Sequence, residues 1–218
     1  ARRPVPFEIW RCVGPFDEGP MLDDLARVLS SGDAIERRAA ALGLSACRDA
    51  GAANLLRFGF DEWHSNSYFP ICIAPLLNVY DFALIEGQYK LRQMVGAVLD
   101  LMFFNLGSDS YQGIWGTTHG RSYGHYVKYP DFEGSSPLSW MLFGNGSLSK
   151  GTSGMAPVCL GTSTYQPPKI ISAMATDTTS VIESKERHGI LRTSMRHADF
   201  VVYRTPDYML SGLQDHRK

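Results

Sequence analysis

The sequence of 218 residues lacks the features that mark several large classes of protein. Its formal net charge is only −1, whereas a nucleic-acid binder needs an excess of basic side chains to displace counterions. It contains no apolar run of about 18 residues, the length that a membrane-spanning helix needs. These absences argue against nucleic acid and membrane as partners. Hydrophobic residues make up 44% and charged residues 20%, as in a globular protein that buries a core.

Motifs for metal and cofactor binding are also missing. The four cysteines are widely spaced and include no CxxC pair, which predicts neither a zinc site nor a dense disulfide framework. The histidines show no HxH or HExxH spacing, and no GK[ST] follows the glycines between residues 113 and 124. The sequence therefore predicts no metal and no cofactor.

Composition changes near Arg57. Residues 1–57 are poor in aromatic side chains, and the first lysine of the chain is Lys90. Apolar residues recur at helical spacing in MLDDLARVLSSGD and again in AIERRAAALGLSACRD. We expect 1–57 to be a short helical-repeat-like segment, separate from the rest of the chain.

Helical periodicity continues after this boundary. The run ICIAPLLNVYDFALIEGQYKLRQMVGAVLDLMFFNLG predicts two helices, and segment 107–136, rich in Gly and Tyr, predicts an ordered irregular loop. Three short helices are expected in SPLSWMLFGNG, APVCLGTST and PPKIISAMATD, and strands in HADFVVYRTPDYMLSGLQDH. We predict a mainly α fold: an incomplete (α/α) toroid of helix pairs over 58–196, with a β-sheet, the start of a β-sandwich, beginning in 197–218.

Two loops carry most of the polar chemistry. FDEWHSNSY and GTTHGRSYGHYVKY lie beside predicted helices, where a toroid would present them to one cleft. They combine Asn, His, Tyr and Arg without an obvious carboxylate pair. This set suits eliminative cleavage of a uronate polymer, in which the acidity of the C5 proton depends on neutralising the neighbouring carboxylate. A tyrosine can then accept the proton and return it to the leaving oxygen.

The candidate residues follow from this chemistry. Asn66 and Arg121 would hold the carboxylate, His119 would assist proton removal, and Tyr123 would act as base and acid. The remaining candidates would bind substrate, by stacking on sugar rings or by polar contact: Trp63, His64, Trp115, Tyr126 and Lys128. An acidic polysaccharide is the expected partner, and the oligomeric state stays open.

The same stretches carry a family resemblance. FDEWHSNSY, GTTHGRSYGHYVKYPDFEG and the strand-like HADFVVYRTPDYMLSG resemble polysaccharide lyases of the hyaluronate, heparin and alginate type, built from an (α/α) toroid followed by a β-sandwich. The resemblance implies that Asn66, His119, Tyr123 and Arg121 match the Asn, His, Tyr and Arg of such lyases, and a secreted or periplasmic location. RRAAALGLSACRDAGAANLL resembles the Ala-rich helical repeat of EboA-type proteins, which have no assigned catalytic residues.

Other interpretations remain open. A glycoside hydrolase of toroid shape would use Glu62 with Asp61 or Glu133, although adjacent residues on an extended segment point to opposite faces. A non-catalytic helical scaffold is the alternative from another class. The tyrosine-rich loop can also be a purely structural one, and the histidines His64, His125, His188, His197 and His216 can be ordinary structural residues.

Overall fold

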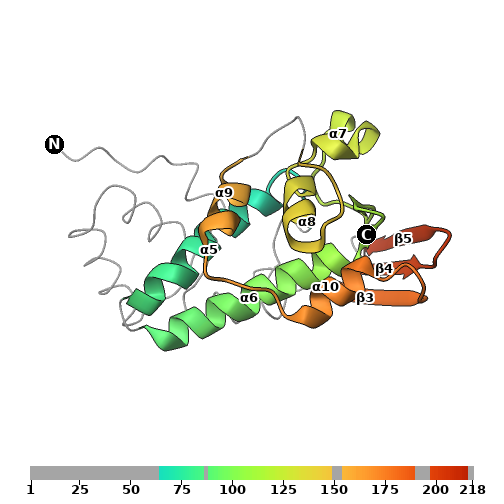
Figure 1. Cartoon of the computed structure of the whole chain (residues 1–218). Helices are drawn as coiled ribbons and strands as arrows, with labels where there is room; N and C mark the ends of the chain where they lie inside the picture. Colours follow the sequence, from blue (N-terminus) through green and yellow to red (C-terminus); the bar gives the residue numbers. More distant parts are fainter. Residues whose placement is uncertain (1–63, 86–87, 149–153, 190–196, 216–218) are drawn as a thin grey trace.

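Two long helices form the centre of the fold. The computed structural model describes residues 64–85, 88–148, 154–189 and 197–215. Helix α5 (Phe69–Ile85) is followed after a short connection by α6 (Tyr89–Ser108), and the two helices run antiparallel and in contact (Figure 1). Their facing sides bury apolar side chains spaced three and four residues apart, including Ile73, Leu77 and Val95. This pair supplies most of the hydrophobic core.

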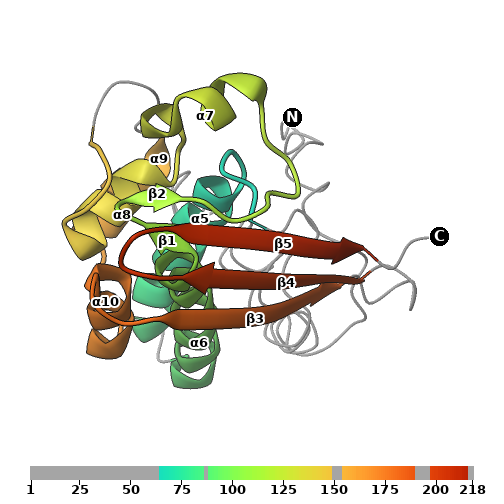
Figure 2. The same ribbon diagram turned by 90° about the vertical axis from the view of Figure 1, so that its right-hand side faces the viewer.

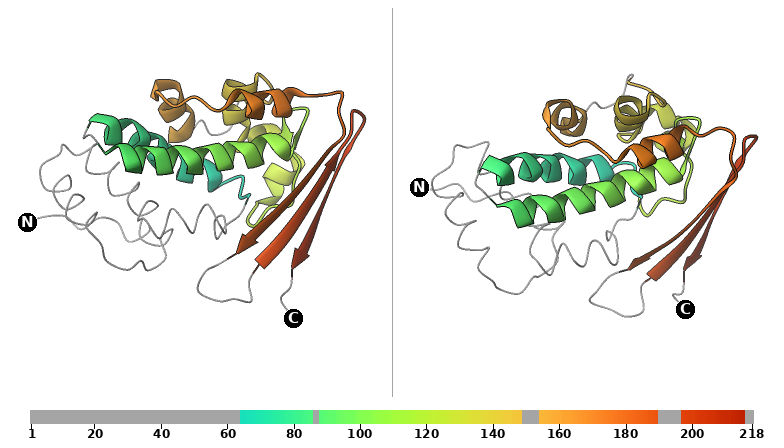
Figure 3. Two further views of the ribbon diagram at one scale, coloured as in Figure 1. Left: turned by 90° about the horizontal axis from the view of Figure 1, so that it is seen from below. Right: turned by 60° about the horizontal axis from the view of Figure 1, so that its bottom comes forward.

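Three eight-residue helices pack on one side of this pair: α8 (Ser136–Phe143), α9 (Met155–Thr162) and α10 (Lys169–Thr176). Helix α9 contacts α5 and α10 contacts α6, while α8 contacts both α9 and α10. Figure 3 shows the three short helices together on the same side of the long pair. Each of these helices has room for only about two turns, so its stability depends on tertiary packing.

A three-stranded antiparallel sheet lies across one end of the helical layer (Figure 2). Its strands are β3 (Ile182–Gly189), β4 (His197–Arg204) and β5 (Met209–Asp215), in the order β3-β4-β5. In the register, Glu186 is paired with Phe200 and Phe200 with Leu213. Because side chains alternate along a strand, one face of β3 and β4 is buried against the helices. This inner face consists of Ser184, Glu186, His188, Ala198, Phe200, Val202 and Arg204.

A small hairpin connects the helical layer to the tyrosine-rich loop. Strands β1 (Ser110–Tyr111) and β2 (Ile114–Trp115) pair directly after α6, around a two-residue turn. Both turn residues have positive φ, 50° at Gln112 and 82° at Gly113, as a type I′ hairpin turn requires. Helix α7 (Gly124–Lys128) and the 3₁₀ turn η1 (Pro130–Phe132) come next along the chain. The hairpin thus sets the direction in which the loop leaves the core.

Arg204 fastens the sheet to the helical layer. Its side chain is 3% exposed, and it donates hydrogen bonds to the carbonyl oxygens of Gly107 (3.2 Å), Ser110 (2.6 Å) and Met174 (2.6 Å). These oxygens lie at the ends of α6 and α10 and in β1, where helix carbonyls lack intrahelical partners. One guanidinium therefore ties three helical-layer segments to β4.

The expected toroid is wrong for the described part of the chain. About 50% of its residues are helical and 18% are in strands, arranged in two small antiparallel sheets. Among the described elements, α5 and α6 alone form a long antiparallel pair, and the later helices are too short to extend a ring of such pairs. The sheet also begins at Ile182, fifteen residues before 197, the expected start. The physical reason is that β3 carries polar residues on both faces, so it does not look like a strand in the sequence.

Several predictions lie outside the described residues. These are the helical-repeat-like segment 1–57, together with Asp61, Glu62 and Trp63. The two helices expected after residue 70, the three short helices and the strands over 198–213 all correspond to observed elements. Segment 107–136 has little regular structure beyond the hairpin, α7 and η1.

Replacing Arg204 with Met should destabilise the protein. The substitution keeps a long apolar stem but leaves three carbonyl oxygens without their donor, and we expect unfolding by urea to show a loss of about 2 kcal/mol or more. Arg187→Met is the matched control, because Arg187 pairs with Asp199 at the surface of the same sheet. Equal midpoints for the two variants would contradict the role given to Arg204.

Candidate functional site

The two loops singled out in the sequence meet in space. Ser65 Oγ donates a hydrogen bond to the carbonyl oxygen of Arg121 (2.9 Å), and Asn66 Nδ2 donates to Ser122 Oγ (3.0 Å). The backbone carbonyl of His64 accepts a hydrogen bond from His119 Nδ1. Three contacts between segments 55 or 56 residues apart therefore hold residues 64–66 against residues 119–122, and Tyr123 follows next in the chain.

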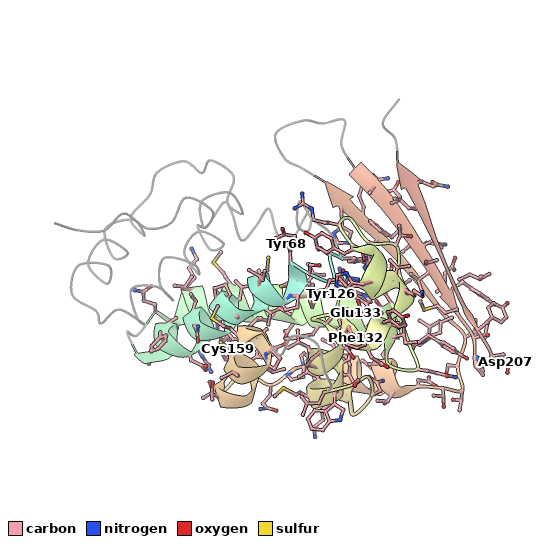
Figure 4. All side chains as sticks on the ribbon, turned by 90° about the horizontal axis from the view of Figure 1, so that it is seen from above. Tyr68, Tyr126, Phe132, Glu133, Cys159 and Asp207 are labelled. Carbon is pink, nitrogen blue, oxygen red and sulfur yellow. The ribbon has the colours of Figure 1, made fainter. Side chains whose placement is uncertain are left out.

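The outward side of this region is rich in polar aromatic side chains. Tyr123 is 46% exposed, Lys128 is exposed, and Tyr126 is half-buried with its ring centroid 3.9 Å from that of His125. Figure 4 shows Tyr68, Tyr126 and Glu133 near the end of α5 that faces the sheet. We call Tyr68, Arg121, Tyr123, Tyr126 and Lys128 the tyrosine surface.

Arg121 is braced against Tyr68 on this surface. Its Nη1 donates to the Tyr68 hydroxyl (3.1 Å), and its guanidinium carbon lies 5.2 Å from the centre of the Tyr68 ring. Arg121 is an exposed residue, and its planar guanidinium has the geometry that matches a carboxylate. This arrangement fits bidentate binding of a carboxylate.

A buried carboxyl group lies beneath the loop. Glu133 is 4% exposed, and its pKa is raised from 4.5 to about 7, first because burial disfavours the charged form. Hydrogen bonding with Asn66 and Ser135 opposes this shift, and the nearby charge of Asp131 adds to it. Glu133 is therefore partly protonated at neutral pH. The sequence pattern suggests this residue only as a hydrolase carboxylate.

Two of the expected sugar-binding residues are interior residues instead. Trp115 is 2% exposed and packs its ring against Phe69, 4.7 Å away between centroids. His64 is 4% exposed and lies 5.3 Å from the Trp115 ring. No sugar ring can stack on Trp115 in this conformation, because its faces are covered by protein.

His119 is one of the residues that hold the two loops together. Burial lowers its pKa, which the backbone carbonyls of His64 and Trp115 oppose by favouring the protonated ring. Its ring also meets the Trp115 ring edge-on at 5.5 Å. These contacts orient His119 toward the interior side of the loop.

His64 turns into a second polar cluster, on the inner face of the sheet. Its Nε2 lies 3.0 Å from Glu186 Oε2, and His188 Nε2 lies 2.8 Å from the same oxygen. His64 Nδ1 lies 3.7 Å from Asp109 Oδ2. The backbone of His64 has φ of 48°, a conformation that non-glycine residues rarely adopt.

The two carboxyl groups of this cluster have pKa values shifted in opposite directions. Burial alone would raise the pKa of Glu186, but hydrogen bonds and charge from His188 and His64 lower it to about 2. The pKa of Asp109 is raised to about 6, first by burial and then by the charge of Glu186. No local sequence motif signals this cluster, because its members come from four positions between 64 and 188.

Comparison with family models, with curated proteins and with solved structures finds no match for this chain. Among the described residues, none of the helices combines the length and apolarity needed to cross a membrane. The resemblance to polysaccharide lyases therefore remains a prediction, and the geometry of the site has to support any function proposed.

Replacing Glu133 with Gln should change how stability depends on pH. Since the pKa of Glu133 is about 7 in the folded protein and ordinarily 4.5, the folded state binds the proton more tightly. Protonation of Glu133 therefore adds to the free energy of unfolding. This addition is fully present below pH 4.5 and is lost as pH rises through 7, and the free energy of unfolding falls by at most about 1.4 kcal/mol per pH unit.

Glu133→Gln should remove this part of the pH dependence and should be relatively more stable than wild type at pH 8. The measurement is urea unfolding of both proteins from pH 4 to 8. Glu183→Gln, on the exposed face of strand β3, is the control and should follow wild type. Parallel wild-type and Glu133→Gln curves would show that the Glu133 carboxyl is not perturbed.

Proposed function

We propose that the protein binds an acidic, uronate-containing polysaccharide at the tyrosine surface and cleaves it by elimination. The observation that carries the proposal is the placement of Arg121. Arg121 donates a hydrogen bond to the Tyr68 hydroxyl and lies two residues from Tyr123 in the chain. Its neighbour Ser122 accepts a hydrogen bond from the buried Asn66. The proposal is supported by the hydrogen bonds that tie the loop carrying the cation and the phenol to the segment carrying the amide.

Arg121 and Asn66 would neutralise the uronate carboxylate. Arg121 can bind both oxygens in its fork, while Asn66 can donate to one of them. In the free protein the Asn66 amide donates to Ser122 Oγ and is 1% exposed. Asn66 also hydrogen-bonds with Glu133. Binding at Asn66 thus requires the carboxylate to replace either Ser122 or Glu133 as a partner of the amide, with a movement of the loop that carries both.

Tyr123 would carry the proton transfer. As phenolate it removes the C5 proton, the electron pair forms the C4–C5 double bond, and the bond from C4 to the leaving oxygen breaks. The proton on Tyr123 then passes to that oxygen, so the tyrosine begins and ends the cycle in the same state. Arg121 lies two residues away in the chain. His119 would position this loop through its bond to the His64 carbonyl.

The hydrolase alternative receives less support from the described residues. Its carboxylate Glu133 is 4% exposed and is directed to Asn66 and Ser135 rather than to the surface. Inverting and retaining hydrolases both need two carboxyl groups that flank the scissile bond.

Tyr123→Phe tests the proposed acid and base. We expect turnover of alginate, hyaluronate or heparin, whichever the wild type cleaves, to fall by roughly 10²–10⁴, since the proton transfer depends on one oxygen. Binding should stay within about threefold, because the ring remains. The assay follows the ultraviolet absorbance of the unsaturated product. Tyr129→Phe, exposed in the same loop, is the control, and equal activity of the two variants would exclude the role of Tyr123.

Exchanging the two cations tests the carboxylate-binding residue. Arg121→Lys should lower kcat/KM by about tenfold or more, because lysine offers a point charge in place of a fork. Lys128→Arg should have a much smaller effect, since Lys128 is exposed and lies over the Tyr129 ring at 5.3 Å. If both substitutions reduce kcat/KM equally, the surface binds the polymer by charge alone.

A further inference from the structure

A buried cluster of ionisable side chains joins the sheet to the start of α5, on the interior side of the tyrosine surface. His64 precedes α5, whereas Glu186 and His188 lie two residues apart on β3 and therefore share its inner face. The two histidines are 4% and 5% exposed, and the Glu186 side chain is 10% exposed. Their three nearest ligand-type atoms all lie within 4.8 Å of one another.

The histidines converge on a single carboxylate oxygen. The distances from Glu186 Oε2 are 3.0 Å to His64 Nε2 and 2.8 Å to His188 Nε2. Two imidazole nitrogens and a carboxylate oxygen at about this mutual separation are what three ligands around one small cation present, since zinc–ligand distances are about 2.0–2.2 Å. The aromatic rings of Trp115 and Phe200 pack against His64 and seal the cluster on two sides.

Hydrogen bonds between neutral side chains do not satisfy every buried polar atom of this cluster. If both Nε2 atoms donated to Glu186 from neutral rings, His64 Nδ1 would be a bare acceptor facing the carboxylate of Asp109. In the structure, His64 Nδ1 and Asp109 Oδ2 are both buried without a hydrogen-bond partner. They lie 3.7 Å apart, with Asp109 0% exposed. Buried polar atoms of this kind need an explanation, such as an ion.

A cation resolves that arrangement. When a metal takes the lone pair of His64 Nε2, the ring proton must sit on Nδ1, which can donate to Asp109 once their 3.7 Å separation closes. Carboxylates commonly orient metal-binding histidines in this way. A doubly protonated His64 would serve the same two atoms without a metal, so the two arrangements differ in the metal content of the protein.

We propose that His64, Glu186 and His188 bind one divalent transition-metal ion, zinc by preference, as a structural site. His64 Nε2, His188 Nε2 and Glu186 Oε2 are the ligands, and Asp109 is a positioning residue that acts through His64. The amide group of Asn105, 3.5 Å from His64 Nε2, closes a further side. Imidazole and carboxylate ligands suit zinc, and three protein ligands leave a fourth tetrahedral position for another ligand. The burial of the cluster favours a structural role for the ion.

Such an ion would connect parts of the chain that are far apart in sequence. His64 and Glu186 are separated by 122 residues. The metal would fix His64 in its unusual backbone conformation and hold β3 against the helical layer. Its binding free energy would therefore contribute to folding. This inference is independent of the proposed lyase activity, because it concerns ion content and stability.

The metal content of the purified protein tests the proposal. The full chain is expressed with zinc in the medium, purified without chelator and analysed by plasma mass spectrometry. We expect about one zinc per chain, and removal by a strong chelator should lower the thermal midpoint. In cobalt-loaded protein, intense visible absorption would report tetrahedral nitrogen and oxygen ligands.

Variants assign the ligands. Glu186→Gln and His188→Ala should lose the ion, whereas His125→Ala, an exposed histidine of α7, should keep it. Asp109→Asn should retain the stoichiometry at saturating zinc but weaken affinity by about 10–100-fold, measured by competition with a chelating dye. If a ligand variant does not fold, the chelator and cobalt measurements on wild type still decide.

Two results would overturn the proposal. The first is wild-type protein that contains no zinc, nickel, iron, cobalt or copper after exposure to each, with a thermal midpoint unaffected by chelator. The cluster would then be a hydrogen-bonded set of charges. The second is equal loss of metal in His125→Ala and His188→Ala, which would indicate adventitious binding at the surface.

Discussion

The contact between His64 and Glu186 is the constraint on which the arrangement of sheet and helices depends. Ionisable groups this deeply buried are tolerated only when each is paired, so the inner face of β3 must lie where His64 is. Arg204 satisfies three carbonyl oxygens at the other end of the same face. Between these two polar anchors, Phe200 and Val202 fill the apolar part of the interface. The polar pairs thus set the position of the sheet on the helices, and apolar side chains fill the interface between the two pairs.

One five-residue segment links the interior with the surface. His64 turns inward to Glu186, Ser65 and Asn66 bond the loop that contains Arg121 and Ser122, and Tyr68 supports the Arg121 side chain. A movement of His64 in the buried cluster would therefore shift the tyrosine surface, because only a few backbone atoms separate the two.

The sequence predicted the helices better than the sheet and the buried cluster. Residues Leu91, Val95, Val98 and Met102 repeat at helical spacing, and all four are buried in α6. Strand β3 reads ESKERHG after its first residue, with polar residues on both faces, so alternation of apolar and polar side chains could not reveal it. The two loops were identified from composition alone. Their mutual contacts, and the inward turn of His64, depend on tertiary packing that no local pattern encodes.

The hairpin between α6 and the loop has a consequence for how this protein can vary. Gly113 lies against the backbone of Gly146, and a Cβ added at Gly113 would be 2.2 Å from the Gly146 nitrogen. A Cβ at Gly146 would in turn be 2.9 Å from the carbonyl oxygen of Ser136. A substitution at one glycine cannot make room for a side chain at the other. The nearest atoms at both positions belong to the main chain, which no substitution removes. Natural variation should therefore accumulate around this pair while the two glycines stay fixed together.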